Sequence, residues 1–209
     1  MKELAPGVFH LERTVGSNGF LVDTGDGLIL IDPGMTLHLN QTAKDLRSRG
    51  LSAHNVKHLL LTHYDFDHAQ GAAEWARRTG ATTWVGAADA EIMRHQAPAP
   101  NTPFRRLIAL AGIPKLPDDA TLIEGDTEIV HGIRALPTPG HTPGHLAFVL
   151  GEVAFIGDAG LVDKQGKLGP MPAFLDTDRD RAAASRMILN GLQLNTICAG
   201  HSAPFVQAH

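Results

Sequence analysis

The segment Thr62–His68 reads Thr-His-Tyr-Asp-Phe-Asp-His and places four metal-ligand side chains within six residues, namely His63, Asp65, Asp67 and His68. Imidazole and carboxylate groups together suit Zn, Fe or Mn. Two histidines and two aspartates this close would be costly to desolvate unless a cation lay among them. The segment therefore predicts a metal site, with a solvated polar loop as the weaker alternative.

Three further candidate ligands follow, each where a predicted strand gives way to a loop. His141 lies within Pro-Thr-Pro-Gly-His-Thr-Pro-Gly-His, Asp158 ends Ala-Phe-Ile-Gly-Asp, and His201 ends Ile-Cys-Ala-Gly-His. Each of the three follows a glycine, which leaves room for the loop to approach a metal. Each one alone could equally be structural. Together with the Thr62–His68 segment, they predict one metal centre.

Strands and helices must bring these side chains together. Short apolar runs predict strands at 7–13, 18–23, 28–31, 56–61, 82–85, 121–123, 128–130, 133–136, 146–150, 153–156 and 196–199. Helices are expected over 36–49, 71–79 and 179–192, and Gly50 and Gly80 end the first two. The last helix is expected to bury Ala184, Ile188 and Leu192. Strand pairs followed by helices in each half predict two packed sheets with helices outside them.

Residues 93–118 differ from the rest because five prolines interrupt them. We interpret this segment as an insertion or lid within a single domain covering 1–209. It contains a short amphipathic helix around Phe104–Ala111, beside Arg94, Arg105 and Arg106. These arginines could attract an anionic substrate group, or they could be an ordinary solvated face.

The composition narrows the classes of partner. The chain has 209 residues, 43% of them hydrophobic, and a formal net charge of −4 without a basic run, so we expect no nucleic-acid partner. It has no apolar signal core and no apolar run of membrane-spanning length, so we expect a cytoplasmic protein without a membrane partner. The single cysteine, Cys198, excludes an intrachain disulfide and is expected to be a buried small hydrophobe. A small-molecule substrate is expected, and a homodimer is left open.

For the remaining histidines, a structural or surface role is the first interpretation. His145 follows His141 by four residues and is expected to support the centre or the fold. His58 is expected to be a packed or edge residue of its strand. Six others have no neighbouring candidate ligands and are expected at the surface: His10, His38, His54, His95, His131 and His209.

The order and spacing of the candidate ligands resemble the metallo-β-lactamase-fold superfamily. The motif His63-x-Asp65-x-Asp67-His68 is followed after 72 residues by His141, after 16 more by Asp158 and after 42 more by His201. The resemblance covers nearly the whole chain. It implies an α+β fold, a four-layer αβ/βα sandwich with metals at one edge of the two sheets.

Carried over by position, the resemblance implies two divalent cations. His63 and His141 would hold metal one, while Asp67, His68 and His201 would hold metal two, with Asp158 bridging both. Asp65 departs from the pattern because most relatives have a histidine there. A carboxylate is a harder ligand that favours Fe or Mn over Zn, or it could bind weakly and leave site one partly occupied. We expect Zn, with Fe or Mn as alternatives.

The resemblance implies a hydrolase in which a metal-bridging hydroxide attacks an ester, thioester or lactone. Asp67 would orient the hydroxide, and Tyr64 could donate to an oxyanion or simply pack. The His141 segment resembles glyoxalase II, but only eight residues follow His201, so its helical C-terminal domain is not expected and a lactonase-like or esterase-like branch stays open. The main alternative is an iron oxidoreductase such as a persulfide dioxygenase, which Asp65 favours. A non-catalytic metal-binding protein is a third hypothesis.

Overall fold

The apolar run Leu28–Ile31 forms the central strand of a seven-stranded sheet in the computed structural model, which describes residues 1–12, 14, 16–97, 103, 107, 110 and 112–207. All four residues of this strand are buried, because both faces of the sheet are covered. The strand order is β1 (Lys2–Ala5), β2 (Val8–Leu11), β3 (Gly19–Asp23), β4 (Leu28–Ile31), β5 (Val56–Leu60), β6 (Thr82–Gly86) and β7 (Thr121–Ile123). Strands β1 to β4 pair antiparallel, and β4 to β7 pair parallel.

A second sheet comes from the C-terminal half of the chain. Its order is β15 (Phe205–Val206), β14 (Thr196–Ala199), β11 (Val153–Gly157), β10 (Leu146–Leu150), β9 (Arg134–Pro137) and β8 (Thr127–Glu128). Strands β11 and β14 are parallel, and the other pairs are antiparallel. A two-stranded ribbon joins β12 (Leu161–Val162) to β13 (Leu168–Gly169).

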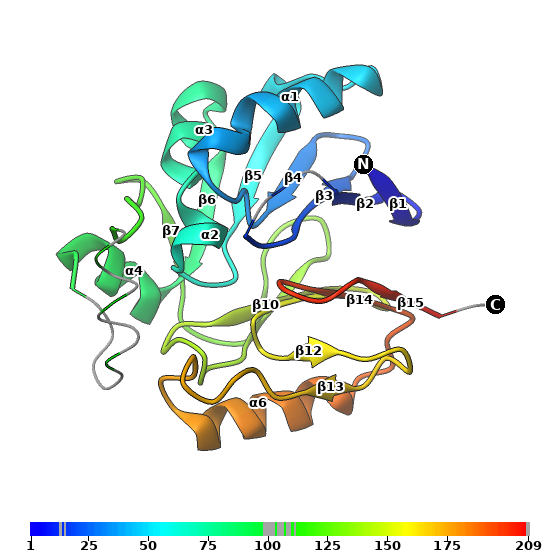
Figure 1. The fold of residues 1–209 in the computed structure, drawn as a ribbon. Helices are drawn as coiled ribbons and strands as arrows, with labels where there is room; N and C mark the ends of the chain where they lie inside the picture. The colour runs from blue at the N-terminus through cyan, green and yellow to red at the C-terminus, as the bar shows by residue number, and fades with distance from the viewer. Residues whose placement is uncertain are drawn as a thin grey trace.

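The helices lie outside the two sheets (Figure 1). They are η1 (Thr36–His38), α1 (Leu39–Ser48), η2 (Ala53–Asn55), α2 (Phe66–Ala69), α3 (Ala72–Thr79), α4 (Ala87–His95) and α6 (Arg179–Asn190). In Figure 1, α1 and α3 cover the outer face of the first sheet, and α6 covers the outer face of the second. Within the described part of the chain, no helix combines the length and apolar character needed to cross a membrane.

Three hydrophobic cores separate four layers. One core packs Leu39 of α1 and Trp75 of α3 against Leu30 of the first sheet. A middle core packs the inner faces of the two sheets together. A third packs Leu189 of α6 against strands of the second sheet, including Ile197. The expected four-layer αβ/βα sandwich, with its α+β class, is therefore confirmed.

One edge of this sandwich gathers the strand ends that precede the candidate ligands. Strand β5 ends next to His63, β9 leads to His141, and β11 and β14 end just before Asp158 and His201. A hydrogen bond joins the two halves at this edge: the Leu146 amide donates to the Thr62 carbonyl oxygen at 2.8 Å. Parallel strands bring their carboxyl ends to the same edge, so segments far apart in sequence meet there.

One expectation about helices was wrong in part, and one helix was not anticipated. Leu192 packs against the third core as expected, but Ala184 and Ile188 are exposed. Helix α6 buries Ala182, Ser185 and Leu189, whereas Ile188 is 52% exposed. The buried face therefore runs through Ala182 and Leu189, and it can include Ser185 because that hydroxyl donates to the Pro139 carbonyl oxygen at 2.7 Å. Helix α4 was not anticipated and extends into the expected insertion, up to His95.

The insertion itself can be followed only in part. Phe104, Arg105, Arg106 and Ala111 lie outside the described residues, so the lid and the anion-attracting arginines stay predictions. Leu107 and Leu110, which are described, are 62% and 82% exposed. The single-domain organisation over 1–209 likewise stays a prediction.

His38 was expected at the surface but is buried, with 5% of its area exposed. The short helix η1 turns its ring inward and leaves Leu37 72% exposed instead. Burial lowers the pKa of His38. His58 is partly buried, as expected, and its Nδ1 accepts a hydrogen bond from the Trp84 indole N–H at 3.2 Å.

Candidate metal centre

Asp32, at the end of β4, orients the imidazoles of His63 and His68. Its Oδ2 accepts a hydrogen bond from His68 Nδ1 at 2.8 Å, so Nδ1 carries the proton and Nε2 is left as an acceptor. The Thr62 hydroxyl donates to the same Oδ2 at 2.7 Å, and its oxygen lies 2.9 Å from His63 Nδ1. That hydroxyl therefore accepts from His63 Nδ1, which also leaves Nε2 of His63 bare. Both Nε2 atoms are available to a cation.

His63, Asp65 and His141 converge on one point. Asp65 Oδ2 lies 3.1 Å from His141 Nε2 and 3.4 Å from His63 Nε2. Ligand atoms about 2.1 Å from a tetrahedral Zn lie roughly 3.4 Å apart. These separations match such a cation, and the three residues form a group that could hold one.

Asp67, His68 and His201 form a second group of this kind. His201 Nε2 lies 3.4 Å from Asp67 Oδ2 and 3.5 Å from His68 Nε2. The side chains of Asp67 and His201 are 29% and 31% exposed, while His63 and His68 are fully buried. His68 is itself a member of this second group, which therefore reaches solvent through Asp67 and His201.

The Asp158 carboxylate lies between the two groups. Its Oδ2 is 3.2 Å from His201 Nε2, 3.4 Å from His141 Nε2 and 4.0 Å from His63 Nε2. Its Oδ1 is 3.4 Å from His68 Nε2. One carboxylate thus reaches four imidazoles from both groups, the placement that a bridging ligand needs.

Electrostatics in this centre favour added positive charge. Burial alone would raise the pKa of Asp158, but the imidazoles of His68 and His201 hold it well below its ordinary value. Burial opposes a proton on His141, yet the carboxylates of Asp176 and Asp65 raise its pKa to about 9. Without a cation, the carboxylates raise the pKa of His68, His141 and His201, whereas burial lowers that of His63. Metal binding to the three protonated imidazoles would release protons.

Buried polar atoms without partners indicate that the residues fit a metal. Among the described residues, His63 Nε2 and Asp158 Oδ1 are buried and accept no hydrogen bond. Leaving such atoms unpaired costs about 1–3 kcal/mol each, which a coordinated cation would offset. The donor set of imidazole nitrogen and carboxylate oxygen suits Zn, Fe or Mn.

His145 holds the backbone of Asp158 in place through a hydrogen bond. Its Nε2 accepts the Asp158 backbone N–H at 3.1 Å, so Nδ1 carries the proton and donates to the Thr138 hydroxyl at 2.8 Å. Burial and the neighbouring His63 and His141 keep its pKa well below the ordinary value. Both of its ring nitrogens are therefore occupied within the fold.

The two candidate catalytic residues lie in different surroundings. Asp67 is partly exposed beside His201, where it could contact a substrate or water. Tyr64 is 5% exposed and belongs to the core between the helices and the first sheet, together with Trp75 and Met93. This environment favours the packing role that the sequence left open for Tyr64. Cys198 is fully buried, and burial raises the pKa of its thiol.

Sequence reasoning missed two carboxylates beside the centre. Asp32 follows a buried strand that pairs with β5, and that place was a usable signal. Asp176 is 5% exposed, and its Oδ1 lies 3.6 Å from His141 Nδ1. It precedes α6 in a segment without a recognisable motif, so no local signal identified it.

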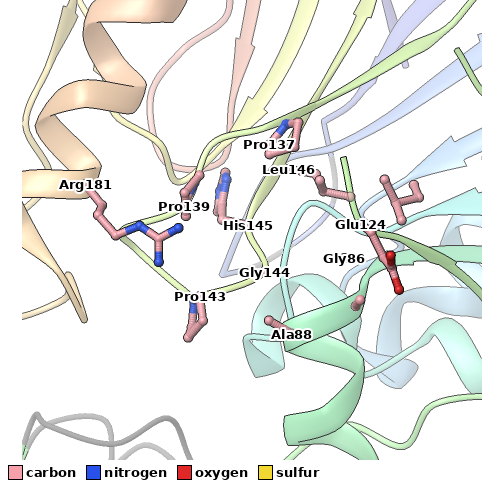
Figure 2. A pocket seen from close by; sticks show the side chains of 12 residues that line it. Gly86, Ala88, Glu124, Pro137, Pro139, Pro143, Gly144, His145, Leu146 and Arg181 are labelled. Atoms are coloured by element: carbon pink, nitrogen blue, oxygen red, sulfur yellow. The ribbon is translucent and has the colours of Figure 1, made fainter. Parts of the chain in front are cut away.

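Two cavities adjoin the loops of the centre. One of about 260 Å³ is lined by residues from the Thr14–Asn18 loop and by Gly200, His201, Ser202 and Ala203. The other, of about 320 Å³, is lined by Pro139, Pro143 and His145 of the His141 loop and by the first turn of α4. Figure 2 shows Arg181 and Glu124 on opposite sides of this larger cavity.

Known proteins are similar to this chain in sequence and in fold. The family model described as "Metallo-beta-lactamase superfamily" matches residues 13–201. The chain is 25% identical over 233 residues to the Bacillus subtilis protein named "Probable metallo-hydrolase YflN", covering 97% of this chain and 86% of that protein. It is 29% identical over 157 residues to "Lactamase-like protein nscB" of Aspergillus fumigatus, covering 73% of this chain but only 39% of that protein.

Solved structures give the same result at the level of the fold. The structure described as "TTHA1623 in a di-iron-bound form" superposes with a TM-score of 0.73 and 26% sequence identity. The match covers 95% of this chain and 94% of that one.

Proposed function

Because this chain belongs to the metallo-β-lactamase superfamily, we propose that it is a hydrolase that uses two divalent cations to cleave an ester, thioester or lactone. The observation that carries this proposal is the place of Asp158, whose two carboxylate oxygens lie within 4.0 Å of the imidazoles of His63, His68, His141 and His201. A carboxylate shared between two ligand groups can bridge two cations, which supports a two-metal site.

The proposed ligands divide into two sets. Site one is held by His63, Asp65 and His141, and site two by Asp67, His68 and His201, with Asp158 shared. The chemistry that two cations held by these residues would supply is a nucleophile from water near neutral pH and polarisation of the substrate's carbonyl oxygen. Zn is the leading candidate, although the oxygen ligand Asp65 keeps Fe and Mn open.

The chain's own residues contribute orientation and access. Asp32 holds the imidazoles of His63 and His68 with their Nε2 atoms bare. The partly exposed Asp67 is suited to accept a hydrogen bond from an attacking water. The 260 Å³ cavity beside His201 supports entry of a small substrate from the side of site two.

An iron oxidoreductase is the second candidate function. It is favoured by Asp65, whose carboxylate is a harder ligand than an imidazole. The similar protein TTHA1623 was solved in a di-iron-bound form, which supports the same possibility for this chain. A dioxygenase acting on a persulfide is the form of this alternative that the sequence favours.

The test combines metal content with turnover. The protein is expressed without added metal, and bound metals are measured by elemental analysis. The same sample is offered lactones, thioesters, aryl esters and glutathione persulfide, with oxygen uptake recorded. We expect close to two Zn or Mn per chain together with ester, thioester or lactone cleavage. One or two irons with oxygen consumption and no hydrolysis would support the oxidoreductase instead.

A pair of matched variants connects the activity to the centre. Asp158→Asn removes the charge shared by both sites, so we expect loss of bound metal and of turnover. Asp126→Asn changes an exposed carboxylate that pairs with Arg134, and it should leave both unchanged. Full turnover in the Asp158→Asn protein would contradict the dinuclear proposal.

A further inference from the structure

Asp89, in the first turn of α4, is a buried carboxylate outside the candidate ligand set. Its exposed area is 0%, and it lies between two loops that both carry proposed ligands of site one. One loop holds His63 and Asp65, and the other holds His141. Burying an isolated carboxylate is costly unless hydrogen bonds compensate, so its partners indicate what it does.

Three hydrogen bonds from these loops end on Asp89. Its Oδ2 accepts the Tyr64 backbone N–H at 3.1 Å and the Thr142 hydroxyl at 2.7 Å. Its Oδ1 accepts the Gly144 backbone N–H at 2.7 Å. Tyr64 stands between His63 and Asp65, and Thr142 directly follows His141. One side chain therefore ties the two loops together across 78 residues of sequence (His141 minus His63).

The backbone around Asp89 is packed too closely to admit a side chain at Gly86 or Gly144. A Cβ atom on Gly86, the residue before α4, would overlap the Gly144 carbonyl oxygen. A Cβ atom on Gly144 would overlap the Asp89 backbone nitrogen and lie 2.9 Å from its Oδ1. Figure 2 shows Gly144 next to Gly86 and Ala88 at the start of α4. The helix start and the His141 loop thus touch through their backbones.

We propose that Asp89 is a positioning residue that sets the distance between the His63–Asp65 loop and the His141 loop, and thereby shapes metal site one. The inference rests on the proposed function, because it concerns ligands of that centre. The hydrogen bonds of Asp89 come from the Tyr64 and Gly144 backbone and from the Thr142 hydroxyl, so it acts through the backbone and Thr142.

A carboxylate suits this place better than an amide. Two of its three partners are backbone N–H groups that can only donate, and an ionised carboxylate only accepts. An asparagine could keep the Gly144 bond through its carbonyl oxygen, and its NH₂ group could donate to the Thr142 oxygen. That NH₂ group would then face the Tyr64 N–H, donor against donor. Burial raises the pKa of Asp89 to about 6, while its bonds from Thr142 and Gly144 oppose this rise.

The test uses two variants and two readouts. Asp89→Asn breaks the Tyr64 bond, and Thr142→Val removes only the hydroxyl. The metal-free proteins are titrated with Co²⁺ against a chromophoric chelator, with the visible absorption recorded for each bound ion. Amide hydrogen exchange of Tyr64 and Gly144 is measured by NMR on the same metal-free proteins. Leu46→Ala, in the core under α1, is the control for general destabilisation.

In Asp89→Asn we expect the affinity for one ion to fall by about 10–100-fold, the usual effect of losing a group that orients metal ligands. The other ion should keep its affinity within about threefold, because the hydrogen bonds that hold the site-two ligands are unchanged. Exchange at Tyr64 should accelerate. Thr142→Val should lower the affinity for the same ion by a smaller factor. Leu46→Ala should lower the melting temperature without a selective loss of affinity for one ion.

Several results would overturn the proposal. One is wild-type affinity for both ions in Asp89→Asn, and another is an equal loss for both ions that Leu46→Ala reproduces. If Asp89→Asn does not fold, unchanged Co²⁺ binding in Thr142→Val decides against the proposal. Hydrogen exchange is measured without metal. Unchanged protection of the Tyr64 amide would therefore contradict the role of Asp89 without bearing on the dinuclear function. Fewer than two ions in the wild-type protein would instead contradict the dinuclear function.

Discussion

Two glycines next to proposed ligands show how closely single residues are constrained at this centre. Gly157, which precedes Asp158, has a φ of +48° and no room for a side chain beside the Thr62 hydroxyl. At Gly200, which precedes His201, a Cβ atom would overlap Asp158 Oδ1 and lie 2.7 Å from His68 Cε1. Gly157 therefore lets the backbone approach Thr62, and Gly200 lets it approach the shared Asp158 and the site-two ligand His68.

Gly200→Ala should disturb metal binding more than folding. The added methyl group would displace the shared Asp158 carboxylate or the His68 ring, so we expect at least a tenfold loss of metal affinity, the lower end of the range for disturbed ligands. Chelator competition measures this loss. Gly125→Ala is the control, because a Cβ atom there meets nothing within 4 Å. Equal metal affinity in the two variants would show that the close approach at Gly200 is unimportant.

At the scale of elements, α3 carries its own charge network. Glu74, in its first turn, accepts hydrogen bonds from Arg77 and Arg78, three and four residues further on. These bonds lower the pKa of Glu74 from 4.5 to about 2. Gly80 then ends the helix in the left-handed conformation, with a φ of +71°. The helix that follows the first ligand loop is thus stabilised by local interactions as well as by its buried Trp75.

The Glu74 contribution should depend on pH in a defined direction. Its pKa is lower in the folded than in the unfolded chain, so its stabilisation is fully present above pH 4.5 and is lost as the pH falls toward 2. We expect Glu74→Gln to melt at a lower temperature than wild type at pH 6, and the difference to shrink below pH 4.5. High salt should reduce the difference at pH 6, because the pair is solvent-exposed. A difference that stays constant down to pH 3 would refute this role for Glu74.

At the scale of the whole molecule, the middle core makes the two halves depend on each other. Phe20 and Ile31 come from the first sheet, and Phe148 and Phe155 come from the second. The rings of Phe20 and Phe155 meet with centroids 5.6 Å apart. Since the proposed centre draws ligands from both halves, its geometry depends on this contact between the sheets.

Phe148→Ala should weaken both halves together. Its side chain is fully buried, so the truncation should lower the free energy of unfolding by about 3–5 kcal/mol. Urea unfolding followed by fluorescence and circular dichroism should still show one transition. Leu37→Ala, at a residue that is 72% exposed, should change stability by less than about 0.5 kcal/mol. Two separate transitions in Phe148→Ala would mean that the halves unfold independently.

The sequence alone predicted the features that depend on local pattern. Apolar runs such as Leu28–Ile31 and Leu146–Leu150 predicted strands because buried strands need continuous apolar side chains. The order and spacing of His63, Asp158 and the other candidate ligands predicted the family. These ligands follow successive strands along the chain, so their pattern can be read from the sequence. Gly80 predicted a helix end, because only a residue that tolerates positive φ fits there.

Only the tertiary structure decided which distant groups meet. Asp32 and Asp89 accept hydrogen bonds from partners 25 to 55 residues away, and no local periodicity predicts such a pairing. The buried face of α6 likewise includes Ser185, whose hydroxyl finds the Pro139 carbonyl oxygen 46 residues away along the chain. A sequence pattern states which side chains avoid water. The order of strands in the sheets determines which buried polar groups find a partner, and that order is a property of the folded molecule.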